Sequence, residues 1–291
     1  MSARSAPQTM RWFTRLQHRA EDIRNICFFA LCPLKSVSTT ICVGNNDTAK
    51  QLQIEQWTSL GSGGFVWSGA RRLAAYLDQH GSTSHTPRSS SAIIAKRPWQ
   101  GLNVIELGAG TGALGLSIAA MGANVTLTDQ ASFIFPATLR HDDARKLQTR
   151  SLLDLLKINV QQNIQHTHHS GSDQQQQAKE VQVREMLWGD DDAMLAGLPC
   201  STYDVIVAAD VLLFKDAQKD LLCSLRHLSD DRTIIFIEHT DRSSNGNVYP
   251  VDLLHFLDLL ERDEQVPWYP KIVSDHGRHI TLCIERGPTR F

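Results

Sequence analysis

Several features that would place this chain of 291 residues in other classes of protein are missing from it. Its six cysteines include no C-x-x-C pair, and Cys27 and Cys32 have no further partners at metal-ligand spacing, so we expect no metal site. No apolar run approaches the roughly 18 residues that span a membrane. The formal net charge of −2 gives no sign of a nucleic-acid partner. We therefore expect an intracellular globular protein with reduced thiols.

The most informative stretch runs from Asn103 to Gln130 and reads NVIELGAGTGALGLSIAAMGANVTLTDQ. A short apolar strand leads into a turn with three glycines, and a helix-length apolar segment follows it. Gly122 is placed to end that helix, and a second apolar strand ends on Asp129. The pattern predicts a βαβ unit of a parallel sheet, whose glycines allow the backbone to approach a ligand at the positive end of the helix.

The glycines alone leave the ligand open, because Gly108, Gly110 and Ala113 also satisfy the dinucleotide pattern G-x-G-x-x-G/A. Glu106 separates the alternatives, since it lies near the place that the pyrophosphate of a dinucleotide would take. A carboxylate there repels a diphosphate but suits a ligand that carries an ammonium and a sulfonium. Asp129, at the end of the second strand, can accept two hydrogen bonds from a ribose. An α/β domain whose glycines only permit close packing is the remaining alternative.

The pattern E-x-G-x-G-x-G, followed by a strand that ends in aspartate, closely resembles that of the seven-strand (class I) S-adenosylmethionine-dependent methyltransferases. Three further segments resemble the small non-histone protein-lysine methyltransferases of that class: FVWSGARRLAAYL at 65–77, LWG at 187–189 and AADVLL at 208–213. The resemblance covers about residue 40 to the C-terminus. It implies an α/β fold with a Rossmann-like seven-strand sheet, mostly parallel with the last strand antiparallel, helices on both faces and an N-terminal β-hairpin extension.

The resemblance also implies S-adenosylmethionine as the cofactor, bound where ligands bind in open α/β sheets, at the carboxyl ends of the strands. Trp67 is then expected to line the cofactor pocket and Trp188 to pack beside the adenine. Packing in the core is the alternative for both tryptophans. The predicted cofactor-binding residues are Trp67, Glu106, Gly108, Ala109, Gly110, Asp129, Trp188 and Ala209.

The acceptor side departs from the family pattern. In the resembled family a D-x-x-Y motif after the fourth strand orients the lysine amine. Asp210 is present here, but Leu213 takes the place of the tyrosine, and Phe214 follows one residue later. We assign Asp210 as the catalytic residue, and lysine methylation of a protein as the function. A cofactor-binding or assembly protein that has lost catalysis is the alternative, and a nicotinamide-dependent oxidoreductase is disfavoured by Glu106 and Trp188.

Periodicity places further elements along the chain. Thr40–Val43 and Gln51–Ile54 flank a turn-rich cluster and predict the hairpin, and Gly61–Gly64 is interpreted as a flexible loop. Helices are expected at Arg71–Gln79, Leu152–Val160, Asp216–Leu228 and Val251–Leu260, and strands at Val181–Leu187, Tyr203–Ala209, Thr233–Glu238, Lys271–Val273 and His279–Ile284.

We divide the chain into an N-terminal extension, residues 1–38, either helical or flexible, and a methyltransferase domain, residues 39–291, with low-complexity loops near 81–91 and 166–178. The extension is rich in arginine before Glu21, as in a transit peptide, but it runs on without a clear cleavage signal. We therefore expect a cytoplasmic protein, with mitochondrial targeting as the alternative.

The histidine cluster of the second low-complexity loop, which contains His166, His168 and His169, is interpreted as a solvated polar tract and not as a metal site. The family resemblance implies a protein substrate, such as a chaperone or a translation factor. Neither a membrane nor a nucleic acid is expected as a partner.

Overall fold

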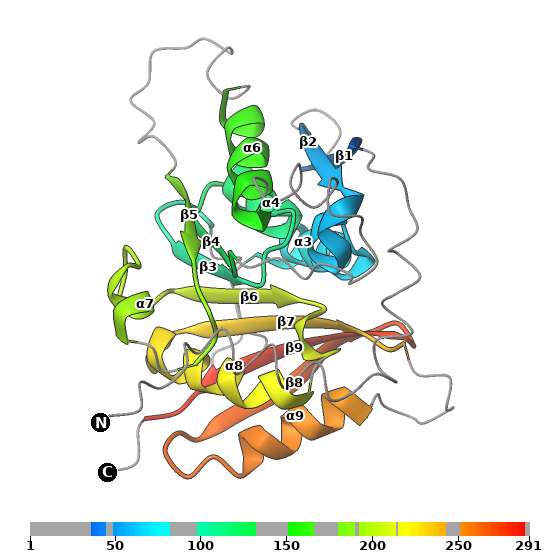
Figure 1. Cartoon of the computed structure of the whole chain (residues 1–291). Helices are drawn as coiled ribbons and strands as arrows, with labels where there is room; N and C mark the ends of the chain where they lie inside the picture. The colour runs from blue at the N-terminus through cyan, green and yellow to red at the C-terminus, as the bar shows by residue number, and fades with distance from the viewer. Residues whose placement is uncertain are drawn as a thin grey trace, which may run out of the picture.

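The structure of the chain is a computed structural model, in which a seven-stranded sheet carries helices on both faces and a two-stranded hairpin outside one helix layer (Figure 1). This arrangement confirms the predicted fold class. The described residues are 36–44, 49–81, 98–131, 151–165, 180–189, 192–213, 215–242 and 251–288.

The order of the strands across the large sheet is β5-β4-β3-β6-β7-β9-β8. Strands β3 to β7 run parallel to one another, and β9 runs antiparallel to both of its neighbours, as predicted for the last strand. Strands β3 and β6 are neighbours in the sheet although they do not follow one another along the chain. An open α/β sheet forms its ligand crevice at such a reversal of strand order. The strands are β3 (Asn103–Leu107), β4 (Asn124–Asp129), β5 (Val181–Glu185), β6 (Val205–Ala209), β7 (Ile234–Thr240), β8 (Trp268–Asp275) and β9 (His279–Arg286).

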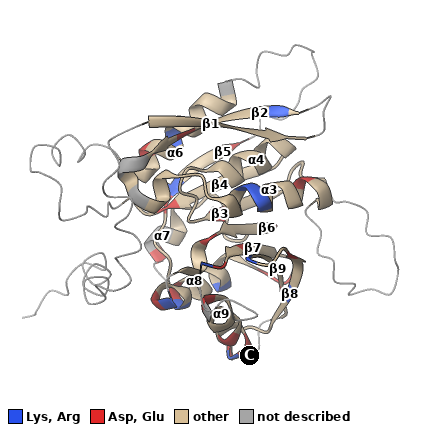
Figure 2. Ribbon diagram, turned by 90° about the vertical axis from the view of Figure 1, so that its right-hand side faces the viewer, with Lys and Arg blue, Asp and Glu red and all other residues tan. Residues whose placement is uncertain are grey.

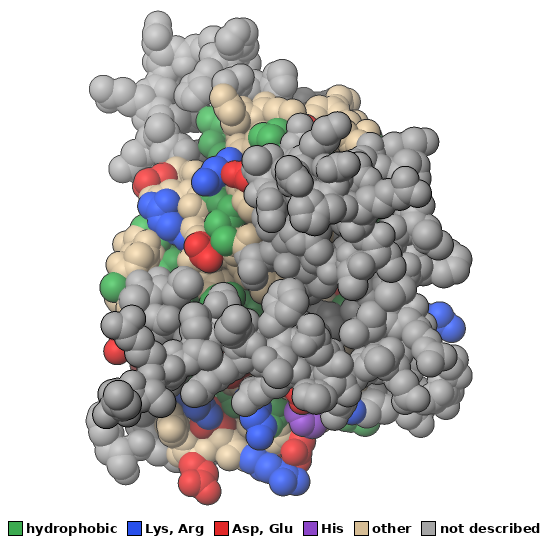
Figure 3. Space-filling view, in the orientation of Figure 1, with side chains coloured by type: hydrophobic (Ala, Val, Ile, Leu, Met, Phe, Trp, Pro, Cys, Tyr) green, Lys and Arg blue, Asp and Glu red, His purple; other side chains and the backbone are tan. Residues whose placement is uncertain are grey.

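Two helix layers cover the sheet, and the expected helices are confirmed. Helices α3 (Ser68–His80), α4 (Ala113–Met121) and α6 (Leu152–Gln165) pack on one face, and α7 (Asp192–Ala196), α8 (Lys215–Leu228) and α9 (Val251–Glu261) pack on the other. Lys, Arg, Asp and Glu are scattered through both layers (Figure 2). On the face seen in Figure 3, basic and acidic side chains lie interspersed over the described surface.

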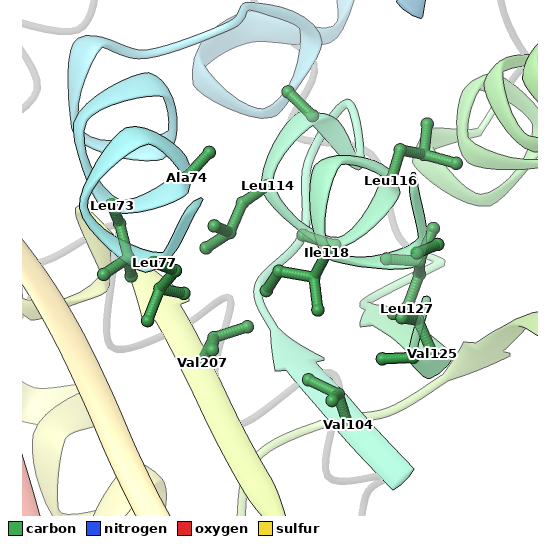
Figure 4. Packing of buried hydrophobic residues seen from close by; sticks show 14 of the residues in the cluster. Leu73, Ala74, Leu77, Val104, Leu114, Leu116, Ile118, Val125, Leu127 and Val207 are labelled. Atoms are coloured by element: carbon green, nitrogen blue, oxygen red, sulfur yellow. The ribbon is translucent and has the colours of Figure 1, made fainter. Parts of the chain in front are cut away.

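Helix α4 is buried around its whole circumference, and its sequence shows why. Residues from Ala113 to Ala119 are all buried and almost all apolar. Figure 4 shows Leu114 and Ile118 pointing towards Leu77 of α3, with Val104 of β3 nearby. The hairpin packs against the same helix and belongs to the same apolar cluster. A helix that is apolar all round needs cover on both sides, and the sheet and the hairpin provide it.

The hairpin consists of the antiparallel strands β1 (Ser36–Val43) and β2 (Lys50–Trp57), each longer than predicted. Two side chains of α6 bind the backbone of β2 as a neighbouring strand would. Asn163 accepts from the Gln53 amide at 2.8 Å and donates to its carbonyl at 2.8 Å. Asn159 accepts from the Glu55 amide at 2.8 Å and donates to its carbonyl at 3.0 Å. The Asn159 amide also donates to the Thr111 carbonyl at 2.9 Å, which ties the hairpin to the glycine turn.

One local expectation is wrong. Gly61–Gly64 lies within a 3-10 helix, η2 (Thr58–Gly64), and is not a loop without structure. The composition suggested flexibility, but the glycines are needed for close packing: a Cβ on Gly64 would lie 2.0 Å from the Trp57 carbonyl oxygen. The histidine cluster near 166 and Phe214 lie outside the described residues. Within the described ranges, no helix has both the length and the apolar character needed to cross a membrane.

Candidate active site

The predicted site residues lie at the carboxyl edge of the parallel strands or in the segments beside it. Glu106 and the glycine turn end β3, Asp129 ends β4, and Trp188 follows β5. Ala209 and Asp210 lie at the end of β6, and Trp67 immediately precedes α3. The structure thus brings residues from across the sheet to one edge. What each of them binds stays a prediction.

The glycine turn after β3 adopts a backbone that other residues rarely take. Gly108, Gly110 and Gly112 have φ of 67°, 55° and 76°, in the left-handed region. The Gly110 amide donates a 2.7 Å hydrogen bond to Asp129 Oδ2. A Cβ on Gly110 would lie 2.9 Å from the carbonyl oxygen of Gly63. The turn is therefore closed from outside by η2, a contact that the sequence did not reveal.

Glu106 holds the helix that follows the turn. Its side chain is only 2% exposed, and Oε2 accepts a 2.8 Å hydrogen bond from the Gly115 amide. That amide lies in the first turn of α4 and has no partner within the helix. The pKa of Glu106 is raised to about 8: burial raises it most, the Gly115 hydrogen bond lowers it, and the nearby Asp129 charge raises it. The raised pKa favours the protonated form of Glu106, and a cationic ligand beside it would favour the carboxylate.

Asp129 links the end of β4 to the glycine turn. Oδ2 accepts from the Gly110 amide and Oδ1 accepts from the Gln130 amide, both at 2.7 Å. Burial raises the pKa of Asp129 to about 6, against the two amide hydrogen bonds, which lower it. Each carboxylate oxygen has a second lone pair, which remains available for a ribose hydroxyl.

Flat and small side chains line the edge on either side of the turn. The half-buried Trp188 ring packs against the turn, because a Cβ on Gly108 would lie 3.2 Å from its Cζ2. The Ala109 amide donates to the Thr128 carbonyl at 2.9 Å, so the ladder between β3 and β4 continues into the turn. Ala209 is half-buried at the end of β6. An indole plane beside a small-residue turn suits the face of a purine.

Asp210 is held in a strained position. Its φ of 58° is positive, which no other non-glycine residue shows in the part of the chain that the structure describes. Such outliers occur mostly at functional sites, where the surrounding structure enforces them. Oδ1 accepts a 2.9 Å hydrogen bond from the Thr240 amide, whereas Oδ2 accepts none from the described residues. A Cβ on Gly69 would lie 2.6 Å from Oδ2, so the carboxylate packs directly on the start of α3.

Arg242 is a site residue that sequence reasoning missed. Its guanidinium lies 3.4 Å from Asp210 Oδ2 and 4.4 Å above the centre of the Trp67 ring. The Trp67 ring is fixed by its Nε1, which donates to the Ser62 carbonyl at 2.7 Å. The fifth parallel strand was predicted to end at Glu238, so Arg242 was not placed at the edge. Arg242 lies two residues after the end of β7, so a correct prediction of where that strand ends would have placed it at the edge of the sheet.

These residues fit S-adenosylmethionine. The ligand carries a sulfonium, an ammonium and a ribose, and the edge offers the carboxyl groups of Glu106 and Asp129 beside a turn of glycines. The buried Asp210 Oδ2 lies 3.4 Å from the Arg242 guanidinium but accepts no hydrogen bond from the described residues, so it can still accept one from a further polar group. Within the described ranges, no cluster of three or more metal-binding side chains occurs. Sheet order, glycine turn and acidic edge together are those of the seven-strand class of S-adenosylmethionine-dependent methyltransferases.

Comparison with protein families narrows this class. The lysine methyltransferase family matches residues 46–138 and 148–256, and the chain belongs to this family. It is 32% identical over 183 residues to the Danio rerio protein N-lysine methyltransferase METTL21A, with 63% of each chain covered. It is 30% identical over 215 residues to METTL21A of Mus musculus, covering 72% of this chain and 73% of the relative.

A second kind of relative is EEF1A lysine methyltransferase 3 of Mus musculus. It is 27% identical over 211 residues, and the alignment covers 71% of this chain and 70% of the relative. The chain spans slightly less than two thirds of the length of the Danio rerio relative.

Proposed function

We propose that this chain transfers the methyl group of S-adenosylmethionine to a lysine side chain of a protein. The observation that carries this proposal is the conformation and environment of Asp210. It is a buried carboxylate, held at positive φ beside the glycine turn that follows β3, and one of its oxygens accepts no hydrogen bond from the described residues. The names of the relatives, which are protein lysine methyltransferases, support the same function.

Methyl transfer to an amine is an in-line displacement, so the protein acts mainly by alignment. When bound, S-adenosylmethionine supplies an electrophilic methyl carbon on its sulfonium. Glu106 offsets positive charge and Asp129 binds the ribose. Asp210 accepts a hydrogen bond from the acceptor amine and thereby directs the nitrogen lone pair towards the donor. The same carboxylate, or a water, receives the proton that the amine must lose.

The position of Leu213 sets a limit on catalysis. The 3-10 helix η4 (Val211–Leu213) begins directly after Asp210, and Leu213 ends it half-buried. The register of the family motif D-x-x-Y is therefore kept, but the phenol is replaced by an isobutyl group. We expect slower transfer than in relatives that carry the tyrosine. A protein that binds the donor without transferring the methyl group is the second candidate, and Leu213 is the observation that favours it.

EEF1A, a translation factor, is the first substrate to test, because one relative is named as its lysine methyltransferase. A chaperone is the second. The full chain is incubated with labelled donor and each purified protein, and methyl-lysine is located by mass spectrometry. Asp210→Asn is the control, since asparagine tolerates positive φ but carries no charge. We expect a labelled lysine that this variant fails to produce while its donor affinity is preserved. Donor binding without any labelled protein, in these mixtures or in a cell lysate, would instead establish the binding-protein alternative.

We also propose that the protein acts in the cytoplasm. The arginine-rich segment lacks a clear cleavage signal, which supports this proposal. Residues 1–40 fused to a fluorescent protein should leave it in the cytosol, and accumulation in mitochondria would contradict the proposal.

A further inference from the structure

Three residues from separate elements form a charged cluster at the acceptor side, which we call the Arg242 clamp: Trp67 before α3, Asp210 after β6 and Arg242 after β7. The guanidinium lies between the ring, at 4.4 Å, and Asp210 Oδ2, at 3.4 Å. Stacking on the ring limits the positions of the guanidinium, because a cation is attracted to an aromatic face. The clamp is thus a fixed ion pair beside the expected path of the acceptor.

Asp210 needs a counter-charge. Its side chain is 3% exposed, and a buried carboxylate without an opposite charge is strongly unfavourable. Among the described residues, Arg242 is the basic side chain in ion-pair contact with it. The Thr240 amide satisfies Oδ1, so Oδ2 is the oxygen that Arg242 balances and that remains able to accept a hydrogen bond.

The chemistry of the acceptor makes this balance important. A lysine amine attacks only when it is neutral, because an ammonium has no lone pair. An unbalanced carboxylate within about 4–6 Å raises the pKa of an amine, and so holds it in the unreactive ammonium form. A carboxylate that is already paired with a guanidinium exerts a much weaker net field, yet its oxygen can still accept a hydrogen bond from a neutral amine.

We propose that Arg242 is a positioning residue for methyl transfer: its guanidinium balances the charge of Asp210, so that Asp210 orients a neutral amine instead of holding an ammonium. This inference rests on the proposed function. In the step that it serves, the amine nitrogen forms a bond to the methyl carbon while the carbon–sulfur bond breaks. The electron pair of that bond stays on sulfur, and the extra proton on nitrogen passes to Asp210 or to water.

Other ionisable groups surround the clamp. Burial lowers the pKa of His239 and of His279, which favours the neutral form of both rings. Burial raises the pKa of Glu238 to about 7, so this group titrates within the range of the test below. The charged and titratable groups around Asp210 and Arg242 are Arg72 of α3, Glu238 and His239 of β7, Asp241 after β7 and His279 of β9.

The test uses the full chain saturated with S-adenosylhomocysteine, the spent donor, and difluoroethylamine as the acceptor probe. This amine loses its proton near neutral pH, and fluorine NMR reports its protonation state when bound. In the unaltered chain we expect the bound probe to titrate at or below the pH at which the free probe does. In Arg242→Gln we expect the titration to move upward by about one pH unit or more, because Asp210 then lacks its counter-charge.

Matched variants separate this role from a merely structural one. Arg242→Lys keeps the charge and should restore most of the original titration. Asp210→Asn combined with Arg242→Gln should abolish the upward shift. Arg232→Gln is the control, because it removes a guanidinium from a surface ion pair with Asp230, in which the Arg232 side chain is 86% exposed. This variant should leave the titration of the probe unchanged. The main comparison is repeated in a Glu238→Gln background, where the shift should persist.

Three results would overturn the inference. The probe could titrate identically in the unaltered chain and in Arg242→Gln. It could titrate above its free value in the unaltered chain already, which would mean that the ammonium displaces Arg242. It could also fail to bind the unaltered chain saturably. None of these results depends on protein methylation, so a chain that shows the shift but labels no protein would refute the proposed function alone.

Discussion

The candidate active site has a donor side, the glycine turn with Glu106 and Asp129 that is expected to bind the methyl donor, and an acceptor side around Asp210. The carboxyl groups of the two sides are held by different interactions. On the donor side, backbone amides bind the carboxyl groups: Gly115 donates to Glu106, and Gly110 donates to Asp129. On the acceptor side, Asp210 also accepts from a backbone amide, that of Thr240, but its second oxygen is balanced by a charged side chain, Arg242. The glycine turn needs residues that accept positive φ, and the donor side follows the family pattern throughout. The acceptor side keeps Asp210 and departs from that pattern at Leu213.

The largest expected effect comes from breaking the backbone of the donor side with Gly110→Val. Valine disfavours a φ of 55°, and its Cβ would lie 2.9 Å from the Gly63 carbonyl oxygen. We expect calorimetry to detect no binding of S-adenosylmethionine. Gly277→Val is the matched control, because Gly277 also has positive φ (73°) but has no atom within 4 Å of its Cβ position and lies in the β8–β9 turn. This variant should melt at a lower temperature and keep its donor affinity. If Gly110→Val binds S-adenosylmethionine normally, the glycine turn is not the binding site of the cofactor.

A smaller effect is expected from Asp129→Ala. The change removes charge-assisted hydrogen bonds to the ribose, each worth about 1.5–3 kcal/mol, and it also frees the Gly110 amide from its partner. Donor affinity should fall at least tenfold in calorimetry. Asp129→Asn retains an acceptor oxygen and should lose less. If Asp129→Ala binds the donor as tightly as the unaltered chain while folded, the ribose assignment is wrong.

Glu106 should make donor binding depend on pH. Its folded-state pKa of about 8 lies above the ordinary 4.5, so a cationic ligand must draw a proton from it at neutral pH. Affinity for S-adenosylmethionine should therefore rise roughly tenfold between pH 6 and 8. S-adenosylhomocysteine lacks the sulfonium charge and should show a weaker dependence. Glu106→Gln should flatten both curves, and a steep curve in that variant would place the titrating group elsewhere.

The same pKa shift predicts a trend in stability without ligand. A raised carboxyl pKa contributes stability that is fully present below pH 4.5 and is lost as the pH rises through about 8. Relative to Glu106→Gln, the melting temperature of the free chain should therefore fall across this window. Thermal melts of the two proteins at matched pH check the trend, and parallel curves would contradict it.

The smallest effect is expected from Leu213→Tyr, which restores the family motif on the acceptor side. A phenol at this position can orient the amine, so lysine methylation should rise severalfold if the ring is accommodated. The larger side chain could instead cost about 1–3 kcal/mol of stability by overpacking. The result is interpreted only when melting temperature and donor affinity are unchanged. Under that condition, an unchanged rate would show that the tyrosine is dispensable in this chain.

The sequence predicted the parts of the site that depend on local pattern. Glu106 and Asp129 end apolar strands, and the ends of parallel strands share an edge, so their placement followed from order along the chain. The glycine turn was predictable for the same reason. The roles of these residues towards the cofactor stay predictions.

The parts that escaped prediction depend on contacts between distant segments. Nothing near Gly63 indicates that its carbonyl closes the turn at Gly110, which lies far along the chain. Composition made that segment look flexible, although close packing requires its glycines. Arg242 was missed because the strand before it extends to Thr240, and a buried strand end with charged residues does not follow the apolar pattern.

The amides of α6 that bind β2 work because two repeat distances nearly coincide. Residues four apart on a helix are separated by about 6 Å along its axis, and residues two apart on a strand by about 6.7 Å. Asn159 and Asn163 therefore meet Glu55 and Gln53 in register, and the helix occupies an edge at which another strand could add. Asn159 also donates to the Thr111 carbonyl in the glycine turn. A shift of β2 along α6 would therefore disturb the contact between α6 and this turn. The spacing of the two asparagines on α6 thus sets the register of this helix against the outer hairpin and links the hairpin to the glycine turn.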